Sequence, residues 1–256
     1  MRPLRVVALG LVAAVPAAPA GAWPAELQIA LLRDACRIVP KTLSRLIYER
    51  EKEVVEEAQR FPVKLGHVLA VDMNGGRLQP ETLAALDAHA GEAIALLRQR
   101  RISEGIVRLG AMLRVPADLA DPALASGSEG YPPGLTREYY SFIEANLSKL
   151  PVTLDDADAL KLPRGRLPAY WQGLLERSRE QTDILRAGMF QRGQVVDHRA
   201  LDFRSPVFAV AQISYSRAVT AIAATWIAMW SEARGDLTRQ PQPRIVTPEE
   251  AAPLNP

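Results

Sequence analysis

The sequence predicts an all-α fold, a single multi-helix domain of about seven helices around a central apolar C-terminal helix. Along most of the chain, apolar residues recur every three or four positions, which is the spacing of one helix face. The alternation of apolar and polar residues that is typical of a strand is nearly absent, and no repeat of fixed period is found. Residues 207–231 contain a single charge, Arg217, as expected for a helix at the centre of a bundle.

The composition is that of an ordinary globular protein. The chain has 256 residues, of which 48% are hydrophobic, 23% charged and 6% aromatic. These fractions exclude wholesale disorder, a collagen-like fibre and a multi-pass membrane protein. The formal charge of +2 equals the contribution of Arg2 and Arg5, so the rest of the chain is neutral. A neutral body lacks the cationic field that drives binding to duplex nucleic acid, so no such partner is expected.

Residues 1–22 have the layout of a secretory signal peptide. Two arginines precede an apolar run over residues 6–15, and small residues follow, ending Ala20-Gly21-Ala22. Cleavage between Ala22 and Trp23 is therefore predicted, which makes the protein exported, either periplasmic or secreted. The apolar run is shorter than the ~20 residues needed to span a bilayer. An uncleaved anchor is the alternative interpretation.

The remaining chain divides into a domain and a tail. Residues 23–237 form the predicted helical domain, whose length suffices for one substantial core. Residues 238–256 contain five prolines in 19 positions and are predicted to be a disordered tail. The only cysteine, Cys36, cannot form an internal disulfide and is predicted to be a buried core side chain.

Each predicted helix has an apolar stripe and a start or stop signal. The expected helices cover residues 25–39, 42–59, 80–101, 103–116, 135–150, 167–189 and 207–233. Pro40 stops the first helix, and Pro80 suits the first turn of the third. Pro116 must kink or end the fourth, and Ser205-Pro206 is a cap and first turn for the last. Between the second and third helices, residues 61–76 form an irregular connection that holds His67.

The last predicted helix is also long enough to cross a membrane. Polar residues interrupt it, however, and Arg217 would lie near mid-membrane at a cost of ~2.5–3.5 kcal/mol. The centre of a helix bundle requires the same apolar character on all sides. We therefore predict a central helix, with a membrane-anchored protein as the alternative.

Few residues of the kinds that carry chemistry stand in recognisable patterns. The motifs HExxH, GxSxG and GxGxxG are absent, and there are three histidines. His67 lies in the long connection and is the best candidate for a site. His89, three residues before Glu92, is predicted to form a solvated pair, and His198 is predicted to be a surface histidine. Asp118 and Asp121 are also three apart and could share one helix face.

Several segments resemble a known family. The features are a tryptophan at the predicted mature N-terminus, the segment GAMLRVPADLADPAL at residues 110–124, and the closing run RSPVFAVAQISYSRAVTAIAATWIAMW. In these the chain resembles the secreted zinc-dependent phospholipase C and single-strand-specific nuclease superfamily. Members of that superfamily are all-α phosphodiesterases with three clustered zinc ions. The resemblance implies that the amine and carbonyl of Trp23 bind a metal.

The chain departs from the family at most metal-ligand positions. In the motif His-x3-Asp-x5-His, the aspartate falls on Asp118, but Arg114 and Leu124 stand at the histidine positions. Gln28 replaces the histidine expected five residues after the terminal tryptophan, and residues 136–147 contain no histidine. His67 stands where the family places a histidine. The resemblance thus implies a ligand cleft formed by Trp23, Gln28, His67, Arg114 and Asp118. It leaves only Trp23, His67 and Asp118 as metal ligands.

Three such ligands cannot assemble a three-metal cluster, because each zinc needs about three protein ligands. We expect Arg114 to occupy the space of a metal and to neutralise Asp118 directly, one helical turn away. The prediction is an exported helical protein, a pseudoenzyme with lost or much reduced catalysis and no cofactor, whose cleft could take a lipid or a protein. The alternative is a weak metal-dependent phosphoric ester hydrolase with a reduced zinc site built from Trp23, Gln28, Asp118 and water.

Overall fold

A computed structural model describes residues 23–64, 76–125 and 131–237. The described residues form an all-α domain, which confirms the predicted fold class. The predicted signal peptide at 1–22, the predicted tail at 238–256 and His67 lie outside the described residues.

Helices account for nearly all the regular structure of the described residues. The α-helices are α1 (Ala25–Cys36), α2 (Lys41–Tyr48), α3 (Glu51–Lys64), α4 (Pro80–Arg98), α5 (Ile102–Gly110), α6 (Arg114–Leu119), α7 (Pro122–Ala125), α8 (Leu135–Asn146), α9 (Leu167–Arg179), α10 (Thr182–Met189) and α11 (Pro206–Glu232). Short 3-10 helices are η1 (Ala111–Leu113), η2 (Leu147–Lys149), η3 (Ala157–Lys161), η4 (Arg164–Arg166) and η5 (His198–Ala200).

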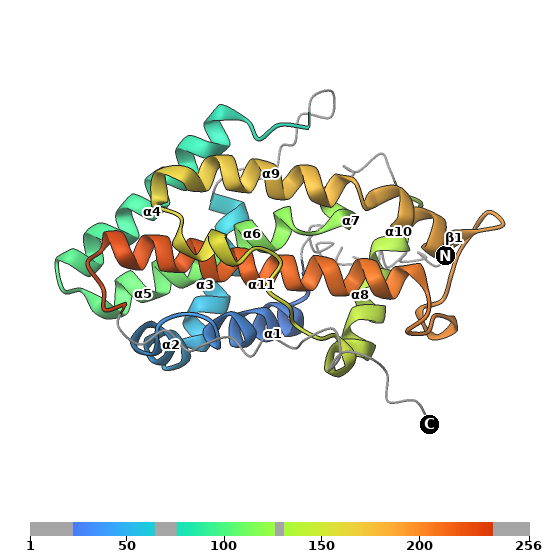
Figure 1. Ribbon diagram of the computed structural model, residues 1–256, viewed down its shortest axis with the longest axis horizontal. Coiled ribbons are helices and arrows are strands. Elements are labelled where there is room, and N and C mark those ends of the chain that lie inside the picture. Colours follow the sequence, from blue (N-terminus) through green and yellow to red (C-terminus); the bar gives the residue numbers. More distant parts are fainter. Residues whose placement is uncertain (1–22, 65–75, 126–130, 238–256) are drawn as a thin grey trace, which may run out of the picture.

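Helix α11 is the axis of the domain, as predicted. In Figure 1 it runs the length of the molecule, with α9 on one side and α1 on the other. It also contacts α4, α6 and α10, which are far apart in the sequence. Ser205 caps its start by accepting a hydrogen bond from the backbone of Phe208, and Pro206 occupies its first turn.

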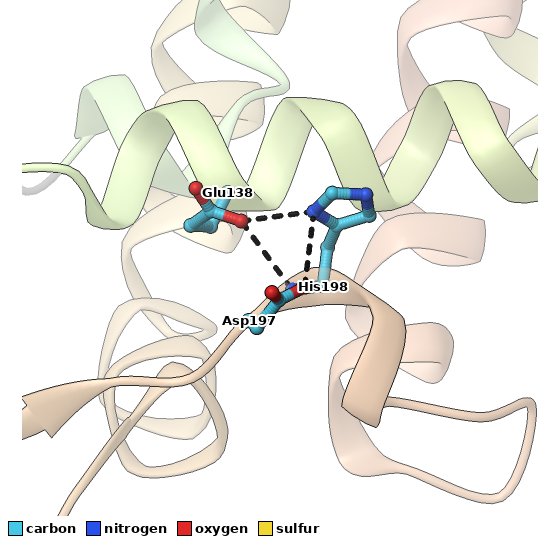
Figure 2. A group of neighbouring side chains, drawn as sticks. All are labelled: Glu138, Asp197 and His198. Carbon is cyan, nitrogen blue, oxygen red and sulfur yellow. Dashed lines mark hydrogen bonds and ion pairs between the residues drawn. The ribbon is translucent and has the colours of Figure 1, made fainter.

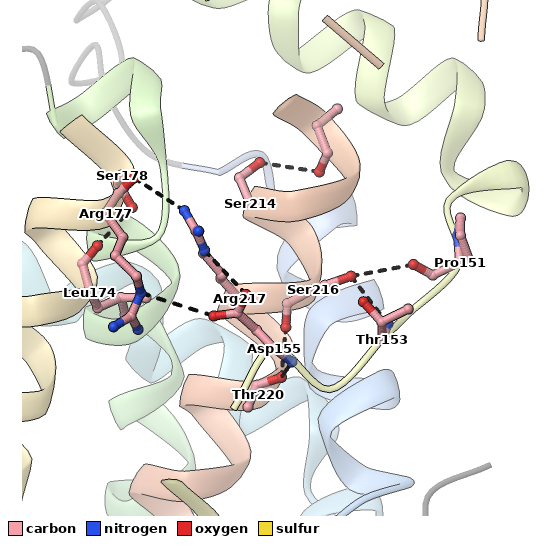
Figure 3. A network of polar contacts seen from close by, with 11 residues as sticks. Pro151, Thr153, Asp155, Leu174, Arg177, Ser178, Ser214, Ser216, Arg217 and Thr220 are labelled. Atoms are coloured by element: carbon pink, nitrogen blue, oxygen red, sulfur yellow. Dashed lines mark hydrogen bonds and ion pairs between the residues drawn. The ribbon is translucent and has the colours of Figure 1, made fainter. Parts of the chain in front are cut away.

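A stripe of polar side chains on α11 holds an irregular segment against the helix (Figure 3). The Ser216 and Thr220 hydroxyls accept hydrogen bonds from the backbone N–H groups of Thr153 and Asp155, at 3.2 and 3.3 Å. Arg217 donates to the Arg177 carbonyl at 3.1 Å and lies 3.4 Å from the Asp155 carboxylate. These polar positions therefore have partners within the domain.

Among the described residues, α11 is the one helix whose length and composition would permit a membrane span. Its most apolar window is 72% buried inside the domain. A helix that is apolar all round and covered by other helices is what a bundle centre requires, so the structure favours the central-helix interpretation.

Two predicted helices are each divided in the structure. The helix expected at 42–59 is α2 followed by α3, and the one expected at 167–189 is α9 followed by α10. Neither junction contains proline or glycine. At the first junction the chain turns so that Ile47 and Val54 are both fully buried, and Glu51 pairs with Arg33 of α1 at 2.8 Å. Burial of the apolar stripes overrides the continuous helical pattern.

The sequence analysis also missed two local features. Helix α3 continues through Lys64, so the connection expected from residue 61 begins later. A short antiparallel hairpin pairs β1 (Phe190–Gln191) with β2 (Gln194–Val195). Its turn residues, Arg192 and Gly193, both have positive φ, which is the geometry of a two-residue type I′ turn.

The predictions for Pro116 and Cys36 can also be compared with the structure. The fourth predicted helix continues past Pro116 to Leu119. It is interrupted before Pro116, by the 3-10 turn η1 between α5 and α6. Proline cannot bond the carbonyl four residues earlier, that of Met112, which lies in η1. Cys36 is 2% exposed, and burial raises the pKa of its thiol to about 12, so it is the predicted core side chain.

Candidate functional site

The structure brings four of the five predicted cleft residues together in the core. Trp23 is 1% exposed, and its indole Nε1 donates a hydrogen bond to the carbonyl of Ala117 at 2.9 Å. The Gln28 side-chain amide donates to the carbonyl of Trp23 itself at 2.7 Å. These contacts tie the start of α1 to α6, which carries Arg114 and Asp118. The fifth residue, His67, lies outside the described residues.

Arg114 and Asp118 form the predicted ion pair. The guanidinium Nε lies 2.5 Å from Asp118 Oδ2, and the two side chains are 9% and 3% exposed. They are four residues apart on one helix face, so the sequence spacing alone allows the contact. Burial raises the pKa of Asp118 to about 6, and the neighbouring Arg114 opposes that shift. The second oxygen, Asp118 Oδ1, is buried and has no hydrogen-bond partner among the described residues.

Asp121 belongs to the same buried group. It is 0% exposed and accepts hydrogen bonds from the Tyr140 hydroxyl at 2.6 Å and from the Ala123 N–H at 2.8 Å. Burial raises the pKa of Asp121 to about 7, with a further contribution from the charge of Asp118. The Tyr140 ring lies 5.9 Å from the Trp23 ring. We call Trp23, Gln28, Arg114, Asp118, Asp121 and Tyr140 the buried polar cluster.

Sequence reasoning found only part of this cluster. The spacing of Asp118 and Asp121 predicted one helix face, but α6 ends at Leu119 and Asp121 lies in the connection to α7, where its carboxylate accepts the Ala123 N–H. Tyr140 had no signal, because it comes from α8 and reaches Asp121, which follows α6, only through the tertiary packing.

The buried polar cluster offers zinc few ligands. Two oxygens, Asp118 Oδ1 and Gln28 Oε1, have no hydrogen-bond partner among the described residues, but each zinc needs about three protein ligands. The Trp23 carbonyl already accepts the Gln28 amide, and Asp118 Oδ2 already accepts the Arg114 guanidinium. Arginine cannot lose its proton and become a ligand. The N–H groups of Gln28 and Arg114 therefore point to the place where the resemblance would put a metal cation.

His89 corrects one prediction. Instead of forming a solvated pair with Glu92, it is 8% exposed, with its Nε2 2.9 Å from the carbonyl of Arg108. Its ring also packs edge-on against Phe61, with the centroids 4.3 Å apart. Burial lowers the pKa of His89 to about 4, so it is neutral and Nε2 carries the proton donated to the carbonyl. Phe61 of α3 and the backbone of Arg108 in α5 lie against the His89 ring, which the local sequence did not indicate.

A second group of ligand-type residues lies near the surface. Glu138 on α8, Asp197 and His198 each bring one potential ligand atom within 4.8 Å of the other two (Figure 2). His198 Nδ1 lies 2.9 Å from Glu138 Oε2 and 3.6 Å from Asp197 Oδ1. The hydrogen bond with His198 holds the pKa of Glu138 below its usual value. We call these three residues the surface triad.

The surface triad changes the interpretation of His198. The sequence indicated a surface histidine after Asp197, but its side chain is only 22% exposed and faces Glu138 across 60 residues of chain. Glu138 lies within residues 136–147, the segment in which the resemblance implies a histidine and the sequence has none.

No family model, curated protein or solved structure matches the chain. The resemblance to the zinc-dependent phospholipase C and nuclease superfamily therefore depends on the residues of this sequence alone.

Proposed function

We propose that this chain is an exported, non-catalytic helical protein that resembles the zinc-dependent phospholipase C and nuclease superfamily. The observation that carries the proposal is the buried ion pair between Arg114 and Asp118 at 2.5 Å. It supplies a permanent positive charge beside the one aspartate that matches the family motif.

The chemistry of that family depends on metal ions. Bound zinc lowers the pKa of water to make hydroxide, and it stabilises the charge of the phosphoryl transition state. A guanidinium can neutralise a carboxylate, but it has no open coordination position for water. Arg114, Gln28 and Leu124 therefore remove the means of activating a nucleophile at this place.

Burial also argues against a ligand in the former cleft. Trp23, Gln28, Arg114 and Asp118 are each at most 7% exposed. A lipid or a protein segment could reach them only if these side chains separated and broke the buried hydrogen bonds. The buried polar cluster is better explained as a structural connection between the start of α1, α6 and α8.

The test measures metal content and hydrolysis in the processed protein, made without a metal-binding tag. Phospholipid vesicles, single-stranded DNA and a generic phosphodiester serve as substrates. We expect no hydrolysis above the Asp118→Asn variant, and no metal whose binding depends on Asp118.

Arg114→His is the second variant to measure, because it restores histidine, a metal ligand, at the first position of the family motif His-x3-Asp-x5-His. Hydrolysis by the unmodified chain that is lost both with a chelator and in Asp118→Asn would overturn the proposal. That result would support the reduced-site phosphoesterase instead.

A further inference from the structure

We propose that Glu138, Asp197 and His198 form a binding site for one divalent transition-metal ion, with zinc as the preferred ion. The site would join α8 to the turn that follows the β1–β2 hairpin. It is separate from the buried polar cluster and does not rest on the proposed function.

The distances suit a shared ion. Zinc bonds of ~2.0–2.2 Å in tetrahedral geometry place neighbouring ligand atoms about 3.4 Å apart. The distance from His198 Nδ1 to Asp197 Oδ1 is 3.6 Å, and that from Nδ1 to Glu138 Oε2 is 2.9 Å. The distance from His198 Nδ1 to Glu138 Oε2 would need to increase by about half an ångström, which a side-chain rotation can provide.

Neighbouring groups orient the two carboxylates. Arg137 contacts Oε1 of Glu138 at 3.1 Å, which leaves Oε2 facing His198. The Arg199 N–H donates to Asp197 Oδ1, the proposed ligand atom, at 2.9 Å because Asp197 caps η5, and a carboxylate oxygen keeps a second lone pair for a metal. Supporting contacts of this kind hold metal ligands in position.

Exposure and donor type favour zinc. The Asp197 side chain is 62% exposed and the other two about a fifth, so an ion and a completing water molecule can enter. Zinc accepts both imidazole nitrogen and carboxylate oxygen as ligands. Calcium and magnesium prefer oxygen donors alone and should bind weakly here.

The competing explanation is a simple ion pair between Glu138 and a protonated His198. It predicts the same metal-free contacts but no affinity for zinc. Metal titration therefore separates the two.

The experiment uses the full processed chain without a polyhistidine tag, stripped with chelator and dialysed. Zinc chloride is titrated calorimetrically at pH 7.5, and bound metal is measured by mass spectrometry after gel filtration. We expect about one zinc per chain, with little competition from calcium. His198→Gln and Glu138→Gln should each weaken binding roughly tenfold or more. Binding should also weaken at pH 5.5, because protons compete for the ligands.

One variant serves as a matched control. Glu144→Gln alters another carboxylate of α8 and should bind zinc as the unaltered chain does. Circular dichroism confirms that each variant is folded.

The absence of saturable zinc binding, or equal binding in His198→Gln, would overturn the proposal. Binding that survives His198→Gln but is lost in Asp118→Asn would place the ion in the buried polar cluster and overturn both proposals. Hydrolysis that depends on Asp118, with zinc binding lost in His198→Gln, would overturn only the proposed function.

Discussion

The buried polar cluster and the surface triad are built from similar chemistry at different depths. In the cluster, Asp118 and Asp121 are 4% and 0% exposed, and each carboxylate has a donor supplied by the chain. In the triad, Asp197 is 62% exposed and lies 3.6 Å from the imidazole of His198. A carboxylate in the core needs a permanent partner, because water cannot solvate it there. Near the surface, water can complete the coordination, so the same residue types remain available to an ion.

The difference in depth also predicts different losses of folding stability when one partner of an ion pair is removed. Removing one partner of a buried ion pair leaves an uncompensated charge and costs about 3–5 kcal/mol. An exposed ion pair contributes only about 0–1 kcal/mol. The variants below test whether depth decides the effect.

The largest effect is expected for Arg114→Ala. It leaves Asp118 buried without its cation, so the free energy of unfolding should fall by about 3–5 kcal/mol at pH 7.5, measured by urea denaturation. The double variant Arg114→Met/Asp118→Leu should recover most of the loss, because no buried charge remains. If Arg114→Ala leaves stability unchanged while Asp118→Ala lowers it, the pairing is wrong.

The next largest effect is the pH dependence due to Asp121. Its pKa of about 7 in the folded protein is above the ~3.9 of an unfolded aspartate, so the folded state binds more protons between these values. The stability contributed by this group is fully present below about pH 4 and is lost as pH rises through 7. The loss is up to about 4 kcal/mol, at about 1.4 kcal/mol per pKa unit.

Urea denaturation between pH 4.5 and 8 measures that dependence. In Asp121→Asn the decline in stability with rising pH should be smaller than in the unaltered chain. Asp202→Asn, in an exposed turn, is the control and should leave the slope as it is. Equal slopes in all three proteins would contradict the assignment.

A smaller effect is expected on the polar stripe of α11, where the buried hydroxyl of Thr220 meets the backbone of the exposed Asp155. Thr220→Val keeps the shape but removes the acceptor of the Asp155 N–H, at a cost of about 1–2 kcal/mol. Hydrogen exchange of the Asp155 amide should accelerate. The Thr153 amide, held by Ser216, is the internal control and should change less. Equal acceleration of both amides would mean that the whole segment detaches.

The smallest effect is expected for Glu138→Gln in metal-free buffer. The Glu138–His198 contact lies near the surface, so its loss should change the free energy of unfolding by less than about 1 kcal/mol. Urea denaturation beside Asp118→Asn makes the comparison direct. A loss as large as that of Asp118→Asn would show that depth does not separate the two groups.

Local spacing accounts for the part of the site that was predicted. Arg114 and Asp118 stand four residues apart, so one helical turn brings them together whatever the rest of the chain does. Tyr140 meets Asp121 only when α8 lies beside the connection between α6 and α7, and His198 meets Glu138 only when the turn after the hairpin lies on α8. His89 was misjudged for the same reason, since the carbonyl of Arg108 that it contacts belongs to the next helix.

The amino-acid sequence by itself determined the helical class and the central position of α11, because periodic apolar residues act within one helix and α11 is apolar on every side. Only the tertiary structure decided where the long helices divide and which polar groups meet between different helices. Those outcomes depend on burial and on contacts between segments distant in sequence, and no local pattern encodes them.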